Sequence, residues 1–75
     1  MDINNFISKF SEQFEDINAA DFSAETKFKT LDEWSSFIAL SIIAMVDEEY
    51  QKEVTGEDIR NSETIQNLFD IVTNK

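Results

Sequence analysis

Several residue types are missing from this 75-residue chain, and each absence excludes a class of chemistry. Without cysteine the chain has no disulfide and no thiolate nucleophile. Without histidine it lacks the usual zinc sites and cannot form a Ser-His-Asp triad. Paired carboxylates remain, but a domain this small has little room for a deep pocket. We therefore expect neither an enzyme nor a metal site.

Proline is also absent, and Gly56 is the single glycine. Both residue types mark turns, so their scarcity favours long helices over a turn-rich β architecture. A chain of this length buries only about 60% of its unfolded surface, so its core must be packed efficiently. Seven Phe, one Trp and one Tyr supply large apolar side chains for that core. We expect one all-α domain over residues 1–75, present as a monomer.

Basic residues are few: six Lys and Arg stand against 16 Asp and Glu, which gives a formal net charge of −10. This balance argues against nucleic acid and anionic membranes as partners. It favours basic protein surfaces and fast, salt-sensitive association. The alternative is that the charge serves only to keep a small protein soluble.

Long hydrophobic runs are missing as well. The longest, Phe37 to Val46, is interrupted by Ser41 and is too short to span a bilayer. The first residues show no basic region followed by an apolar run, so we expect no signal peptide and a cytoplasmic location.

The spacing of apolar residues predicts four helices. The first runs from about Asp2 to Ile17, with one apolar stripe formed by Ile3, Phe6, Ile7, Phe10, Phe14 and Ile17. The segment 18–34 has no sustained period and predicts a long loop. We expect a helical turn near Ala24-Glu25, and three apolar anchors that hold the loop on the bundle: Phe22, Phe28 and Leu31.

The second helix is predicted from about Ser36 to Gln51, and apolar residues lie on more than one side of it. At 100° per residue the inward side comprises Ala39, Leu40, Ile43, Val46 and Tyr50, with Ile42 at its margin. Ile38 and Met45 fall on the opposite, polar side, and Phe37 lies at its edge. Apolar residues on an exposed side suggest a contact site, although the helix could instead be buried on two sides.

Two further helices follow. Thr55 to Asp58 resembles a capping box and predicts a short third helix through Ile59. The last helix is predicted to be capped by Ser62 or Asn61. Its apolar stripe comprises Ile65, Leu68, Phe69 and Val72.

Three short segments form a pattern that extends over nearly the whole chain. Ser36 and Phe37 follow Trp34 and open the second helix, and the acidic run 47–50 ends that helix with a tyrosine. Residues 64–66, Thr-Ile-Gln, open the last helix. This pattern resembles the acyl carrier proteins, which have an Asp-Ser-Leu motif, an acidic run ending in an aromatic residue, and a last helix that opens with Thr-Val.

The resemblance implies a fold and a function. The fold would be a four-helix bundle of the acyl-carrier type, with a long first loop and a short third helix. Ser36 would carry 4′-phosphopantetheine, covalently attached, and the protein would hold an acyl or polyketide intermediate as a thioester. A serine at a helix N-terminus suits such a phosphate. The implied partners are a phosphopantetheinyl transferase and acyl-processing enzymes such as ketoacyl synthases, acyltransferases or acyl ligases.

The chain departs from the family pattern in two places. Ser35 occupies the position of the family's aspartate; it can still cap the helix, but the charge that helps the transferase engage is gone. Ile38 and Ser41 stand where carriers typically have acidic residues early on the second helix. These departures suggest a specialised pathway, such as polyketide, unusual lipid or cell-surface product synthesis.

The partner-binding surface is therefore predicted on the second helix, with apolar contacts and acidic steering. Its expected residues are Ser35, Phe37, Ile38, Ser41, Met45, Asp47 and Glu48. The alternative function is an unmodified acidic helical module that holds one partner and makes no use of the Ser36 hydroxyl. A nucleic-acid mimic is a weaker alternative, because it would need charge arrayed in regular rows.

Overall fold

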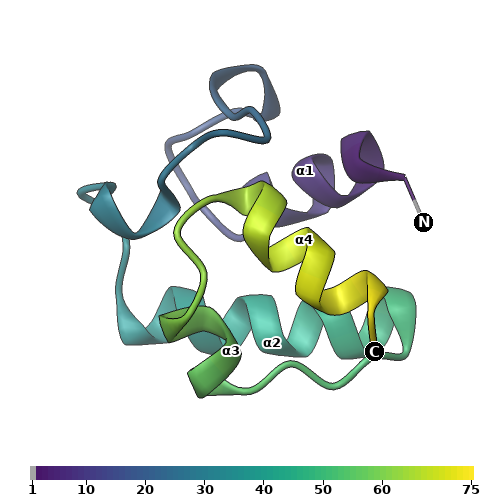
Figure 1. Ribbon diagram of the computed structural model, residues 1–75. Coiled ribbons are helices and arrows are strands. Elements are labelled where there is room, and N and C mark those ends of the chain that lie inside the picture. Colours follow the sequence, from purple (N-terminus) through teal and green to yellow (C-terminus); the bar gives the residue numbers. More distant parts are fainter. Residues whose placement is uncertain (1) are drawn as a thin grey trace.

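The computed structural model describes residues 2–75 and is all-helical in that range, as predicted. Its four α-helices are α1 (Ile3–Ser11), α2 (Ser36–Tyr50), α3 (Gly56–Arg60) and α4 (Ile65–Thr73). Two short 3₁₀ helices, η1 (Ala19–Asp21) and η2 (Phe28–Thr30), lie in the long loop between α1 and α2 (Figure 1). α1 packs against α2 and α4, and α3 packs against the same two helices. Within residues 2–75, no helix is both long and apolar enough to cross a membrane.

Aromatic rings form a continuous network through the core. Phe6 and Phe10 of α1 are fully buried, and Phe10 lies edge-on to Phe28 at a centroid distance of 5.2 Å. Phe28 in turn lies 5.0 Å from Trp34, directly before α2, and Phe6 lies 5.9 Å from Tyr50 at the end of α2. Such ring pairs each add about 0.5–1.5 kcal/mol beyond the area they bury. The network thus ties both ends of α2 to α1.

The first helix is shorter than predicted: α1 ends at Ser11, six residues before Ile17. The N–H groups of Gln13 and Phe14 donate to carbonyls three residues back, at 3.2 and 3.0 Å, so the chain turns there. The turn places Phe14 5.7 Å from Phe10 and 5.2 Å from Phe22. Packing against these rings outweighs the helical spacing that continues in the sequence.

The long loop is anchored as predicted at Phe22 and Phe28, which are both buried, and Leu31 packs half-buried against the core. Ala24 and Glu25 form a turn closed by the Thr26 N–H and the Ser23 carbonyl at 3.1 Å, and the helical turns lie at η1 and η2 instead. Backbone bonds also join this loop to the start of α4. They run from Ile65 N to Thr26 O (3.2 Å) and from Gln66 N to Ala24 O (2.8 Å).

The third helix opens as predicted, because the Thr55 hydroxyl accepts from Asp58 N and the Asp58 carboxylate accepts from Thr55 N.

The predicted cap of the last helix is wrong. Thr64, not Ser62 or Asn61, caps α4 by accepting from Asn67 N at 3.1 Å. Ser62 is buried, and its hydroxyl donates to the Asp58 carbonyl at the end of α3.

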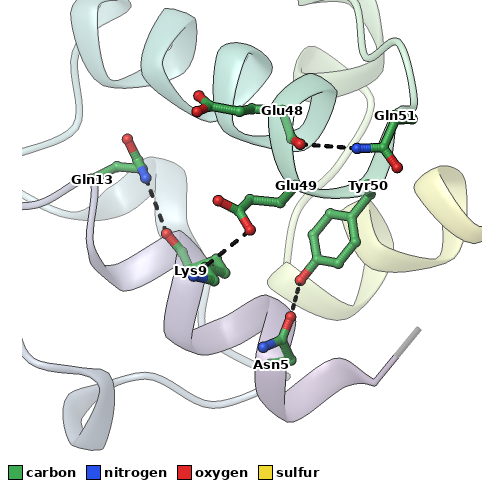
Figure 2. A network of polar contacts seen from close by, with 7 residues as sticks. All are labelled: Asn5, Lys9, Gln13, Glu48, Glu49, Tyr50 and Gln51. Carbon is green, nitrogen blue, oxygen red and sulfur yellow. Dashed lines mark hydrogen bonds and ion pairs between the residues drawn. The ribbon is translucent and has the colours of Figure 1, made fainter.

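Side-chain contacts also hold α1 against the end of α2 (Figure 2). The Tyr50 hydroxyl donates to Asn5 Oδ1 at 2.6 Å, and Lys9 Nζ lies 3.7 Å from Glu49 Oε1. Partial burial raises the pKa of Tyr50, and the nearby carboxylates of Glu49 and Asp2 raise it further by smaller amounts. The Tyr50 hydroxyl therefore stays a donor at neutral pH. α2 ends at Tyr50, and the following residue, Gln51, adopts the left-handed conformation that usually favours glycine (φ 54°).

The aromatic network makes a testable prediction about stability. Phe10→Ala removes a fully buried ring and should lower the free energy of unfolding by about 3–5 kcal/mol. Phe37→Ala removes an exposed ring of the same kind and should change it by less than about 0.5 kcal/mol. Urea unfolding of the two variants measures both values. Similar losses of stability in the two variants would show that the buried Phe10 ring stabilises the fold no more than the exposed Phe37 ring.

The α3 cap makes a prediction about pH. The Thr55 backbone N–H, and then the Lys75 ammonium, lower the pKa of Asp58. A lowered folded-state pKa adds stability that is present above the unfolded-state pKa and is lost as the pH falls through the folded-state value. Asp58→Asn should therefore be less stable than wild type at neutral pH, and the difference should shrink on acidification. Urea unfolding across pH measures it, with Glu57→Gln in the same turn as the control. An equal shrinkage in both variants would contradict the assignment to Asp58.

Candidate functional site

The start of α2 separates two neighbouring hydroxyl groups by their roles. Ser35 is extended (φ −156°, ψ 170°), and its Oγ accepts a hydrogen bond from Ile38 N at 3.3 Å, so Ser35 is the N-cap. Ser36 is the first helical residue and is exposed, and its hydroxyl takes no part in the cap. The structure therefore bears out Ser35 as a cap and presents Ser36 Oγ to solvent at the positive end of a 15-residue helix.

The local sequence explains why α2 starts at this point. Trp34 packs edge-on against buried Phe28 at 5.0 Å, and Trp34 N donates to the Leu31 carbonyl at 3.0 Å, which closes a turn directly before the cap. Ser35 then offers a short side chain that can accept a backbone N–H, and apolar residues follow without a break.

An open groove of about 600 Å³ lies beside Ser36, between α2 and α3. Its apolar wall is formed by Trp34, Ala39, Leu40, Ile43 and Ile59. Its charged lining residues are Lys29 from η2 and Arg60 from the end of α3. A second groove of about 570 Å³ follows along α2, shares Leu40 and Ile43 with the first, and is lined by Asp47 and Glu53.

The outward side of α2 carries two large exposed apolar side chains. Phe37 is 73% exposed and Leu40 is 65% exposed, and they are three residues apart on one side of the helix. Of the nine aromatic side chains, eight join the ring network described above, and Phe37 is the exception. Asp47 and Glu48 continue this surface as exposed carboxylates near the end of the helix. We call Phe37, Leu40, Asp47 and Glu48 the outer surface of α2.

Two predicted partner-binding residues do not lie on that surface. Ile38 is only 8% exposed and Met45 only 6%, and both belong to the core with Ile42 and Val46. The predicted sides of the helix were therefore wrong at three positions, because Leu40 points outward while Ile38 and Met45 point inward. The rest of the predicted inward side packs in or against the core, and Val46 is fully buried. Apolar residues lie nearly all round α2, so the contacts with α1 and α3, rather than the spacing, decide which side is buried.

The other predicted site residues are accessible to different degrees. Ser35 is exposed beside Ser36, whereas Ser41 is half-buried in a groove of about 230 Å³ between α1 and α2. That groove also carries Lys9, Glu48 and Glu49. No group of three or more acidic side chains within residues 2–75 is placed to hold a metal ion.

Three residues of the site were not singled out from the sequence: Leu40, Lys29 and Arg60. For Leu40 a signal was present, since it lies one helical turn from Phe37. For Lys29 and Arg60 there was none, because these two residues are 31 positions apart in the chain and meet only in the fold.

No known protein family, curated protein or solved structure matches this chain.

The different roles of the two serines can be tested through stability. Ser35→Ala removes the N-cap acceptor and should lower the free energy of unfolding by about 1 kcal/mol. Ser36→Ala keeps the cap and should change it by less than about 0.5 kcal/mol. Urea unfolding measures both. A larger loss of stability for Ser36→Ala would show that Ser36, and not Ser35, is the N-cap.

Proposed function

We propose that this chain is a carrier of the acyl-carrier type, with 4′-phosphopantetheine attached to Ser36. The single observation that carries the proposal is the difference between the two serines at the start of α2. The Ser35 hydroxyl is engaged by Ile38 N, whereas the Ser36 hydroxyl is exposed on the first residue of the helix. The resemblance of the surrounding residues to the carrier motif supports the same serine.

The residues present fit a phosphate-linked group. Ser36 Oγ would displace 3′,5′-ADP from the phosphorus of coenzyme A that bears the pantetheine arm. One P–O bond forms as another breaks, and the hydroxyl proton passes to a base on the transferase. The product phosphodiester is an anion at the positive end of α2, where free N–H groups and the helix dipole favour negative charge.

The attached group would supply a thiol, which holds an acyl group as a thioester. The chain has no cysteine of its own, so its side chains offer no competing thiol. The polypeptide would act by tethering, because a tethered acyl group has a high effective concentration at any enzyme that docks. Its function is therefore binding and presentation, without catalysis by its own residues.

The outer surface of α2 is the proposed docking surface for the transferase and for acyl-processing enzymes such as ketoacyl synthases, acyltransferases or acyl ligases. Phe37 lies next to Ser36, so a partner that reaches the serine also meets this exposed ring. Large aromatic side chains at the centre of an interface contribute much of its affinity. The carboxylates of Asp47 and Glu48 would steer partners with basic surfaces toward it.

The loading reaction tests the proposal directly. The chain is incubated with coenzyme A and a broad-specificity phosphopantetheinyl transferase, and its intact mass is measured. We expect the wild type and Ser35→Ala to gain one phosphopantetheine, and Ser36→Ala to gain none. Ser35→Asp restores the charge that the carrier motif has, keeps a capping side chain, and should load faster than wild type. No gain with several transferases would exclude the proposal.

A second variant pair tests docking. Phe37→Ala removes the exposed ring and should lower kcat/KM for loading about fivefold or more, since truncating a central apolar residue costs more than about 1 kcal/mol. Phe37→Leu keeps an apolar side chain and should retain most of the rate. Equal rates for Phe37→Ala and wild type would remove Phe37 from the docking surface.

The second candidate function is an unmodified protein-interaction module. The exposure of Phe37 and Leu40 favours it equally, because neither side chain needs a modified serine to bind a partner. The two functions differ in Ser36→Ala, which would abolish a carrier and leave such a module intact.

A further inference from the structure

Three grooves formed by residues 2–75 differ in charge. The groove between α1 and α2 combines Lys9 with Glu12, directly after α1, and with Glu48 and Glu49 of α2. The groove at the far end of α2 is lined by Asp47 and Glu53. The groove beside Ser36 has two cations, Lys29 and Arg60, and no acidic lining residue. In a chain with 16 acidic and six basic residues, this is the reverse of the overall balance.

Neither cation is neutralised by a carboxylate. The two ion pairs found within residues 2–75 join Lys9 to Glu49 and Lys75 to Asp58. Lys29 Nζ instead donates to the Arg60 carbonyl at 2.8 Å, a neutral acceptor, and the ammonium has two more N–H donors to offer. Unpaired cations lining one groove of a strongly acidic protein favour an anionic ligand there.

The fold holds both cations at this groove. The bond from Lys29 to the Arg60 carbonyl fixes the lysine from η2 across to the end of α3. The Arg60 side chain folds back along α3, since a Cβ atom placed on Gly56 would lie 3.6 Å from Arg60 Nη1. The guanidinium therefore lies close to the first residue of α3. Trp34 forms part of the same groove and is the only tryptophan of the chain.

We propose that Lys29 and Arg60 are positioning residues that hold the phosphodiester of the arm on Ser36, and so keep the start of the arm against the groove. This inference rests on the proposed function. A guanidinium and an ammonium form charge-assisted hydrogen bonds to phosphate oxygens, and these are about twice as strong as neutral ones. No acidic residue lines the groove, so no carboxylate there would repel the Ser36 phosphate. The arm then covers Trp34.

The experiment measures quenching of Trp34 fluorescence by acrylamide, before and after loading. Each chain is first loaded to completion, which intact mass verifies. In the wild type, loading should lower the quenching constant, and 1 M NaCl should abolish this protection, because the screening length is then about 3 Å. In the double variant Lys29→Gln with Arg60→Gln, loading should leave the quenching constant unchanged. Each single variant should lose part of the protection.

Two controls separate the charge from the local structure. Lys27→Gln removes one positive charge from an exposed residue of the same loop outside the groove, and should keep full protection. Lys29→Arg keeps the charge and should also keep it. If loading does not protect Trp34 in the wild type, or protects it equally in the double variant and the wild type, the inference is wrong but the proposed function is unaffected. A wild-type chain that gains no phosphopantetheine overturns the inference together with the proposed function.

Discussion

Edge-to-face packing of Phe10 against Phe28 is the contact on which the position of α2 depends. Phe10 is the ring at which α1, the turn after it and the long loop meet, since it also lies within 5.8 Å of Phe14 and Phe22. Phe28 in turn packs against Trp34, which lies next to the cap of α2. With no disulfide available, burial of these rings is what fixes a loop of this length on a small core.

The site follows from that anchoring. Because Trp34 is held against Phe28, the chain reaches Ser35 in an extended conformation, and Ser35 can cap the helix. The cap leaves Ser36 and Phe37 on the exposed first turn. The same anchoring places η2 beside the end of α3, where Lys29 reaches the Arg60 carbonyl. One set of aromatic contacts therefore places the exposed Ser36 hydroxyl in a groove with two cations, and the exposed Phe37 ring follows it on α2.

The sequence predicted the features that depend on local chemistry. The four helices, the range of α2, the Ser35 cap and the Thr55 capping box all follow from residues close together in the chain. One local feature was predicted wrongly: the cap of α4 is Thr64. The other wrong predictions depend on tertiary contacts. α1 stops at Ser11 because Phe14 packs back on Phe10. α2 is apolar on several sides, so its sequence indicates no unique buried side; Leu40 was predicted to point inward and Ile38 outward, and the structure has the reverse. The cationic groove joins residues far apart in the chain, beyond the reach of any local pattern.

The central claim is that α2 begins between Ser35 and Ser36, so that one hydroxyl is a cap and the other is free. The most direct test is the backbone and ¹³Cβ chemical shifts of these two serines in solution. We expect shifts of extended backbone for Ser35 and of helix for Ser36. Helical shifts at both residues, or extended shifts at both, would move the start of the helix and contradict the assignment of Ser36 as the free hydroxyl.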